Sequence, residues 1–174
     1  MSYLLRHGAN EAGLAMDAAG WVERSEVTRI LGYDDEELNA VLLHNNKDRL
    51  EAFGDRIRAI QGHSVEGAPV TREALEESWE RLASEGVLYH ATRASATDSI
   101  VRNGVSAQGR THVHLATSPG SVATTSGRDE ALVVIDAKIL GERGLGVFRA
   151  ANGVILVRGV PPEAIVEVLV SAQD

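Results

Sequence analysis

The order of helical and extended segments in the first third of the chain limits its fold most strongly. Ser25, and then Asp34 or Asp35, can each cap a helix, because short polar side chains satisfy the free amides at a helix N-terminus. Extended segments on both sides of Gly54-Asp55 predict a β-hairpin over residues 49–60. Helix, helix, hairpin is the order of a winged-helix module, a fold that usually binds nucleic acid but does not by itself determine a function.

Extended segments dominate the second half of the chain. They are expected at residues 87–92, 110–115, 131–136, 147–150, 154–157 and 165–170, with a tight turn at Asn152-Gly153. Ser95 is expected to cap a helix that Gly104 ends, and Ser118-Pro119 to begin another. A charged surface helix is predicted over 71–84. The sequence therefore predicts an α+β protein with an N-terminal lobe (1–65), a linker and surface helix (66–84) and a β-rich lobe (85–174).

Composition excludes several classes of protein. With 174 residues, 44% of them hydrophobic and 24% charged, the chain is typical of a soluble globular protein. It has no apolar run of the roughly 18–20 residues that a membrane span needs, and no signal peptide. It has no cysteine, which excludes disulfides and thiolate chemistry. We therefore expect a cytoplasmic protein, and nothing in the sequence suggests more than a monomer.

The net charge of −8 bears on nucleic-acid binding. A protein that holds a duplex through its general electrostatic field is usually basic. The acidic surplus here is most simply a matter of solvation. Any contact with nucleic acid should therefore be local and depend on a few arginines.

Residues 110–115 alternate polar and apolar side chains. In an extended strand Arg110, His112 and His114 would share one face, while Val113 and Leu115 would enter a core. One cation and two imidazoles on one face suit an anionic ligand or a metal. The alternative is a strand with one solvated polar face.

A metal site would take His112 and His114 as ligands, with His63 or His90 as a third and Asp136 as a fourth. Neighbouring arginines would repel such a cation. A phosphate site uses the same region without that conflict, because guanidinium groups bind phosphate in bidentate fashion.

Each of the other candidate residues, taken alone, is weak evidence for a functional site. Arg6-His7 lies at the end of a short N-terminal helix whose first turns we expect to be missing from this sequence, and helix C-termini attract cations in any case. Arg49 stands at the start of the hairpin and His90 in an apolar segment. The tripeptide Gly62-His63-Ser64 lacks the elbow pattern of a serine hydrolase.

Taken in order, the motifs of the chain resemble the RNA 2′-phosphotransferase family over nearly its whole length. The matching segments are Ser2–His7, Leu14–Val22, Asn46–Leu50, Ile57–Ser64, Leu88–Thr92, Arg110–Leu115, Asn152–Leu156 and Val160–Pro162. Each segment is modest alone, but the ordered set is specific. The departures are Asn46 for a usual Asp, Leu50 for Phe, Ile60 for Asn and Ala91 for Gly.

The resemblance implies a winged-helix RNA lobe followed by an NAD lobe like that of ADP-ribosyltransferases. It implies transfer of an internal 2′-phosphate from RNA, typically a ligated tRNA splice junction, to NAD. The products would be RNA with a free 2′-hydroxyl, nicotinamide and ADP-ribose 1″,2″-cyclic phosphate, and no metal would be needed.

The resemblance also implies a set of site residues. The catalytic set falls on Arg6, His7, Arg49 and Arg110, with His7 orienting the phosphate or a ribose hydroxyl, or carrying a proton. The residues implied to bind NAD are His63, Ser64, His90, Ala91, Thr92, His112, His114 and Leu115. Two other functions stay open: an enzyme that only ADP-ribosylates a terminal phosphate of a nucleic acid, and a non-catalytic RNA-binding protein.

Overall fold

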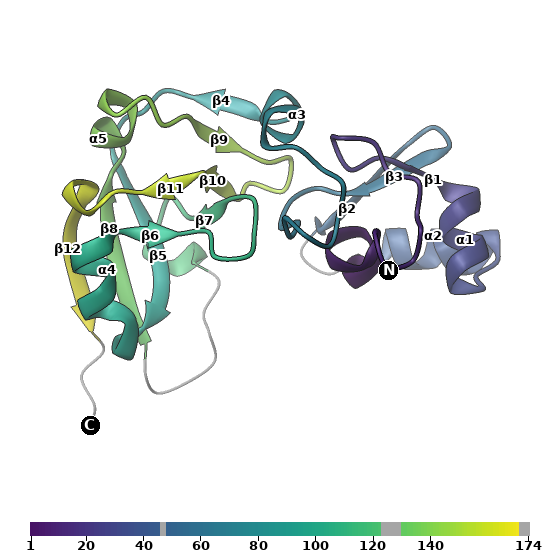
Figure 1. Ribbon diagram of the computed structural model, residues 1–174, viewed down its shortest axis with the longest axis horizontal. Helices are drawn as coiled ribbons and strands as arrows, with labels where there is room; N and C mark the ends of the chain where they lie inside the picture. Colours follow the sequence, from purple (N-terminus) through teal and green to yellow (C-terminus); the bar gives the residue numbers. More distant parts are fainter. Residues whose placement is uncertain (46–47, 123–129, 171–174) are drawn as a thin grey trace. The chain divides into compact units, whose positions relative to one another are not determined.

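The chain forms two compact units in the computed structural model, which describes residues 1–45, 48–122 and 130–170 (Figure 1). The first unit consists of residues 1–80 together with 109–111 and 150–152. The second consists of 81–108, 112–149 and the chain from 153 onward. The boundary after Glu80 falls inside the segment 66–84 that the sequence predicts to be a linker and helix.

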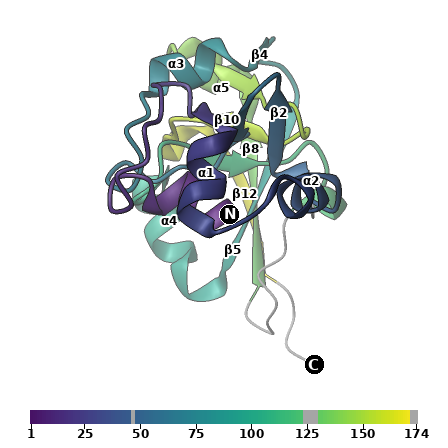
Figure 2. The same ribbon diagram turned by 90° about the vertical axis from the view of Figure 1, so that its right-hand side faces the viewer.

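The first unit combines short helices with a small antiparallel sheet (Figures 1 and 2). Its elements are η1 (Leu4–Gly8, a π-helical turn), β1 (Val22–Glu23), α1 (Arg24–Leu31), α2 (Asp35–Leu43), β2 (Leu50–Phe53), β3 (Arg56–Ala59) and α3 (Arg72–Glu77). The strand order is β1-β3-β2, with Val22 opposite Ile57 and Leu50 opposite Ala59. The predicted order of helix, helix and hairpin is confirmed. The assignment of this unit as a winged helix stays a prediction.

The two helix starts differ in how they are capped. The Asp34 carboxylate accepts the Glu37 amide at 2.8 Å, and the Glu37 carboxylate accepts the Asp34 amide at 3.0 Å, so the predicted cap of α2 is a full capping box. The prediction that Ser25 caps α1 is wrong. That helix begins one residue earlier, after Glu23, which makes no side-chain capping bond.

Apolar side chains from η1, α1, α2 and the three strands of the first unit form one core. Leu5, Val27, Leu38 and Ile57 are completely buried in it. Full burial of such a side chain contributes roughly 1.5–3 kcal/mol. The hydrophobic effect therefore fixes the helix that carries Leu5, and with it the two residues that follow.

The second unit contains three sheets and several short helices. Its elements are β4 (Glu80–Leu82, which begins at the boundary), β5 (Val87–Arg93), η3 (Ala94–Ala96), α4 (Thr97–Asn103), β6 (Val105–Ser106), β7 (Val113–Leu115), η4 (Pro119–Ser121), β8 (Glu130–Asp136), α5 (Ala137–Glu142), β9 (Val147–Arg149), β10 (Ile155–Val157), β11 (Gly159–Val160), η5 (Pro162–Ala164) and β12 (Ile165–Val170). The strand orders are β12-β8-β5, β4-β9-β10-β7 and β11-β6.

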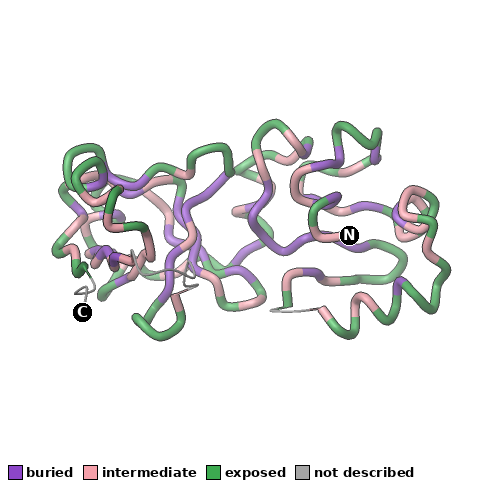
Figure 3. Tube along the Cα trace, turned by 90° about the horizontal axis from the view of Figure 1, so that it is seen from below, coloured by how far each residue is buried: buried purple, intermediate pink, exposed green. Residues whose placement is uncertain are grey.

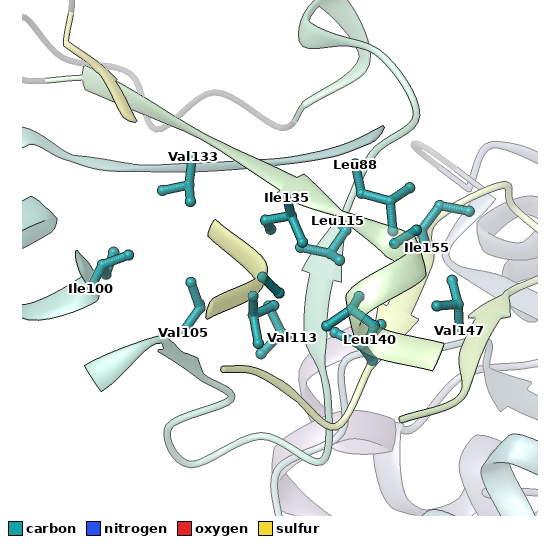
Figure 4. Close-up of a cluster of buried hydrophobic side chains, with 14 residues drawn as sticks. Leu88, Ile100, Val105, Val113, Leu115, Val133, Ile135, Leu140, Val147 and Ile155 are labelled. Atoms are coloured by element: carbon teal, nitrogen blue, oxygen red, sulfur yellow. The ribbon is translucent and has the colours of Figure 1, made fainter. Parts of the chain in front are cut away.

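Aliphatic side chains fill the second unit. Figure 4 shows Leu88 from β5, Val113 and Leu115 from β7, and Val133 and Ile135 from β8 around a common centre. As predicted, Val113 and Leu115 enter the core, and both are less than 5% exposed. Figure 3 shows buried stretches along the trace within each unit. The mixture of helices and sheets confirms the α+β class; the likeness of this unit to ADP-ribosyltransferases stays a prediction.

Two segments depart from the predicted elements. The helix expected over 71–84 ends at Glu77, and 80–82 form strand β4 instead. Trp79 is 7% exposed and its indole donates to the Ile60 carbonyl at 3.0 Å, so the chain turns inward there and the helix cannot continue along the surface. The prediction that Ser95 caps a helix is wrong, because Ser95 lies inside the 3₁₀ turn η3 and α4 begins at Thr97, after Ala96. Gly104 ends α4, as expected.

Apart from the strand expected over 110–115, the remaining predicted elements are confirmed within one or two residues. Asn152-Gly153 forms the turn between β9 and β10, with Gly153 at φ +81°. Pro119 opens a short 3₁₀ helix. No helix in the described parts of the chain is both long enough and apolar enough to cross a membrane. Of the motif that precedes Arg49, Asn46 and Lys47 lie outside the described residues.

Candidate active site

Helix η1 presents Arg6 and His7 at the edge of the first unit. Leu4 and Leu5, which precede them, are buried in the core, whereas Arg6 and His7 are only half-buried. The ring of Tyr3 lies against that of His7, with the two centroids 5.7 Å apart. The apolar side of the helix therefore anchors the residues that carry the polar chemistry.

Arg6 is a cation in an unfavourable position. Burial, followed by the positive charges of Arg49 and Arg110, lowers the pKa of its guanidinium to about 10. Its Nε and Nη2 atoms are buried and have no hydrogen-bond partner among the described residues. No ion pair joins Arg6, Arg49 or Arg110 to a carboxylate in the described parts of the chain. Three guanidinium groups thus gather without a counter-ion from the described residues.

The pKa of His7 is affected by the same arginines. Burial lowers the pKa of its imidazole below the usual 6.5, and the charges of Arg110 and Arg6 lower it further. The neutral form of His7 therefore predominates near pH 7. A neutral imidazole can accept a proton or a hydrogen bond, which a protonated one cannot.

Arg49 is held in place by its backbone. The side-chain oxygen of Asn45 accepts the Arg49 amide at 2.9 Å, and the Asn45 amide group donates to the Leu50 carbonyl at 2.7 Å. The Arg49 carbonyl accepts the Ile60 amide at 2.9 Å. Arg49 therefore enters β2 at a fixed point, with its side chain half-buried.

Arg110 is positioned differently from the prediction. The expected strand over 110–115 is wrong in its first half, because β7 begins at Val113. Arg110 pairs instead with Ser64 in an isolated antiparallel bridge. The Thr111 amide donates to the His63 carbonyl, and the Val65 amide to the Gly109 carbonyl, each at 3.0 Å. These bonds place Arg110 in the first unit, whereas His112 and His114 belong to the second.

The segment Ile60–Val65 joins the three arginine-bearing parts of the first unit. Besides its bonds to Arg49 and to Gly109 and Thr111, it reaches η1: the Ser64 amide and hydroxyl donate to the Arg6 carbonyl at 3.0 and 3.3 Å. The Ser64 hydroxyl also accepts the Gly67 amide at 3.1 Å. One short segment thus fixes the backbone at all three positions.

Gly62 lies at the point where this segment passes the Arg6 side chain. Its φ of +89° belongs to the region that favours glycine, and an added Cβ would lie 3.3 Å from Arg6 Cζ. His63, next to it, is 0% exposed and packs close to Gly20. The family resemblance implied that His63 and Ser64 bind NAD, and this stays a prediction. In the structure both residues also support the backbone of the arginine cluster, and Gly62 is the sequence signal for that role.

Arg72 is a residue that the sequence reasoning missed. It lies at the start of α3, and its Nε donates to the Thr111 carbonyl at 3.0 Å. No motif singles it out, because the contact joins residues 39 positions apart.

The second unit brings together His90 and His114 of the predicted NAD-binding set. Tyr89 and Ala116 exchange backbone hydrogen bonds of 2.9 Å, which align β5 with the end of β7. The Nδ1–H of His90 donates to the His114 carbonyl at 3.0 Å. Burial lowers the pKa of His90, and this hydrogen bond opposes the effect only in part. The neutral ring then keeps the lone pair of Nε2 as an acceptor.

The other predicted members of this set differ in exposure. Ala91 and Thr92 are half-buried on β5, opposite Leu132 and Ala131 of β8. His112 is 2% exposed. The Leu115 side chain belongs to the core, and the residue lies opposite Ile155 of β10. In the described parts of the chain, no group of three or more His, Asp or Glu side chains is arranged to hold a metal.

Comparison with known proteins connects this geometry to a family. Residues 1–159 match the model of the RNA 2′-phosphotransferase, Tpt1 / KptA family. A protein of Thermococcus kodakarensis named "Probable RNA 2'-phosphotransferase" is 34% identical, over 95% of this chain and 92% of its own. A protein of the same name from Pseudomonas syringae pv. tomato is 36% identical, over 97% and 91%. Human "tRNA 2'-phosphotransferase 1" is also 36% identical, over 91% of this chain and 67% of its own.

The matched region includes residues of both units and every arginine of the cluster. The identities exceed 30% across nearly the full length of the chain. The chain belongs to the RNA 2′-phosphotransferase family.

Proposed function

We propose that this protein is an enzyme that transfers an internal 2′-phosphate from RNA to NAD. The products are RNA with a free 2′-hydroxyl, nicotinamide and ADP-ribose 1″,2″-cyclic phosphate. Membership of the family supports the removal of a 2′-phosphate from RNA. The observation that carries the proposal is the Arg6 guanidinium, half-buried beside two further arginines and without a counter-ion among the described residues.

The cluster suits a phosphate monoester. Such a group carries nearly two negative charges near neutral pH and offers three oxygens to donors. Guanidinium groups bind these oxygens in bidentate fashion. An arriving dianion would supply the hydrogen-bond partners that Nε and Nη2 of Arg6 lack, and it would offset the mutual repulsion of Arg6, Arg49 and Arg110.

In the first step, an oxygen of the RNA phosphate forms a bond to C1″ of the nicotinamide ribose. The bond between C1″ and the nicotinamide nitrogen breaks, and its electron pair leaves with nicotinamide. The three arginines hold and orient the nucleophile, and positioning of this kind can supply a large part of a rate enhancement.

In the second step, the ribose 2″-oxygen forms a bond to phosphorus, and the bond from phosphorus to the RNA 2′-oxygen breaks. Because His7 is neutral near pH 7, we assign the proton transfer to it. His7 accepts the proton of the 2″-hydroxyl and returns it to the RNA 2′-oxygen. Negative charge grows on the remaining phosphate oxygens, where the guanidinium groups stabilise it.

We propose that the second unit binds NAD through His90, Ala91, Thr92, His112, His114 and the Leu115 backbone. The Nε2 acceptor of neutral His90 suits a ribose hydroxyl, which is a hydrogen-bond donor. Ala91 is a small side chain on a half-buried strand, so it leaves room beside the backbone. We expect His63 and Ser64 to affect NAD binding less than these residues do, since both are committed to the arginine cluster.

The test is an assay with NAD and a short RNA that bears one internal 2′-phosphate, in the presence of EDTA. Release of ADP-ribose 1″,2″-cyclic phosphate supports the proposal. Accumulation of ADP-ribosylated RNA would indicate an enzyme that stops after the first step. RNA binding without reaction would indicate a non-catalytic RNA-binding protein. Loss of activity on adding EDTA would point back to a metal.

Two arginine variants test whether the catalytic set implied by the family acts in this protein. We expect Arg49→Ala and Arg110→Ala each to lower the rate by at least about tenfold and up to about 10³-fold, as removal of one transition-state donor does elsewhere. Arg29→Ala is the matched control, because Arg29 is exposed on α1 and pairs with Glu26 of the same helix. Near-normal turnover in both test variants would refute the assignment.

A further inference from the structure

The segment Gly109–Thr111 is held from two directions. On one side it pairs with Ser64 and Val65, and its Thr111 amide donates to the His63 carbonyl. On the other side the Thr111 carbonyl accepts Nε–H of Arg72 at 3.0 Å. Arg110, the middle residue, is exposed, yet it lies close enough to His7 and Arg6 to lower the pKa of both. The backbone bonds are therefore what locates its charge.

Arg72 is itself well anchored. The Thr71 side chain caps α3 by accepting the Ala74 amide at 3.2 Å, and the Thr71 amide donates to the Ala18 carbonyl at 3.0 Å. Leu75, one turn further on, is completely buried. The base of the Arg72 side chain is thus fixed in the first unit, and its guanidinium extends from a rigid support to Thr111.

We propose that Arg72 is a positioning residue that holds Arg110 in the phosphate site. The proposal rests on the function proposed above, and it adds a residue that the catalytic set does not contain. Arg72 acts through the Thr111 carbonyl and not through the substrate. Without that bond the segment loses its link to α3 and keeps the bonds along its Ser64 side, so the Arg110 side chain can move away from Arg6 and His7.

The test compares Arg72→Met, which removes the hydrogen bond, with Arg72→Lys, which keeps a donor and the charge. Each is also made in the Arg110→Ala background. Arg29→Met serves as the control for loss of an exposed arginine in the same unit, since Arg29 is paired with Glu26. The readouts are kcat/KM for the 2′-phosphorylated RNA, KM for NAD, and the pKa of His7 followed by NMR of its ring proton.

We expect Arg72→Met to lower kcat/KM for the RNA roughly tenfold, because small displacements of a positioned group cost large factors in rate. KM for NAD should stay the same, and the pKa of His7 should rise as the Arg110 charge moves away. Arg72→Lys should restore most of the activity. In the Arg110→Ala background the effect of Arg72→Met should vanish, since the two residues act as one unit.

Two results would overturn the proposal. One is a His7 pKa that is unchanged in Arg72→Met. The other is an equal loss of activity on Arg72→Met with Arg110 present or absent, which would make Arg72 an independent contact. If the wild-type protein has no transferase activity, the proposed function fails, but the His7 titration still decides whether Arg72 positions Arg110.

Discussion

Arg6 combines a structural cost with the phosphate-binding role that we propose for it. A partly buried cation without a counter-ion destabilises the folded state, and the charges of Arg49 and Arg110 add to that effect. Its helix keeps it there because Leu4 and Leu5 are buried in the core. Sites that bind anions commonly show this conflict, since the ligand completes a set of interactions that the protein alone leaves open.

Arg6→Met should therefore stabilise the free protein and abolish its response to phosphate. We expect a gain of up to about 1 kcal/mol in the free energy of unfolding, a modest value because the guanidinium is only partly buried. For the wild type, inorganic phosphate at 100 times its Kd should add about 2.7 kcal/mol. Denaturant unfolding with and without phosphate measures both effects. A variant that phosphate still stabilises would show that the anion binds elsewhere.

The imidazole of His7 offers a direct measure of the cluster's charge. A nearby cation disfavours the protonated ring, so removing Arg110 as Arg110→Gln should raise the pKa of His7. The neutral form that we assign as proton acceptor would then be lost at a higher pH, and the acid limb of the rate profile should move upward with it. NMR titration of the ring proton checks the first change and kcat against pH the second. A His7 pKa that did not move would place Arg110 away from His7.

At the scale of elements, the segment Ile60–Val65 decides how the arginines lie. Arg58, on β3 just before it, is 5% exposed, pairs with Glu51 and lies over the Trp21 ring at 4.6 Å. The segment thus leaves β3 from a rigid base before it meets Arg6 and Arg110. Its sequence contains only one glycine, and that glycine faces the Arg6 guanidinium.

Gly62→Ala should disturb the cluster more than the fold. The substitution adds a Cβ at 3.3 Å from Arg6 Cζ and strains a φ of +89°. Gly32→Ala is the control: Gly32 has a φ of +69° after α1, and its added Cβ would meet nothing within 4 Å. Both should lose about 1–2 kcal/mol of stability through backbone strain. Only Gly62→Ala should lower kcat/KM for the RNA by tenfold or more; an equal effect of the two on activity would contradict this role.

The elements that the sequence predicted correctly have strong local signals. Asp34 caps α2, Gly54 and Gly153 turn their hairpins, and Gly104 ends α4, because each conformation is set by the residue itself or its near neighbours. The larger errors, in contrast to the wrong caps at Ser25 and Ser95, arise where distant contacts decide the structure. Arg110 pairs with Ser64 and therefore does not belong to the predicted strand. The hydrogen bond from Trp79 to Ile60 turns the chain inward and ends the helix that was expected to reach residue 84.

The residues of the candidate site likewise fall into those that sequence motifs indicate and those that only distant contacts reveal. Arg6, His7, Arg49 and Arg110 could be named from ordered motifs, and the structure brings the three arginines and His7 into electrostatic contact. Arg72 could not be named, because its role depends on a carbonyl 39 residues away. The support that Ser64 gives to Arg6 was equally invisible, since its donors reach a backbone atom and not a side chain.

At the scale of the whole molecule, the charge distribution sets how RNA can bind. The chain carries a net charge of −8, and α2 begins with three consecutive acidic residues after Asp34. Such a surface repels a phosphate backbone. Attraction is therefore confined to places where cations gather without acidic partners, and Arg6, Arg49 and Arg110 form one such place.

The dependence of RNA binding on salt tests this directly. Contacts by about three cations to single-stranded RNA predict a slope of about −2 for the logarithm of the association constant against that of the salt concentration. Fluorescence anisotropy with a 2′-phosphorylated RNA in the absence of NAD measures it. Arg49→Ala should reduce the magnitude of the slope by about 1, and Arg29→Ala should leave it unchanged. A wild-type slope steeper than about −5 would mean that a broad basic surface, and not this cluster, holds the RNA.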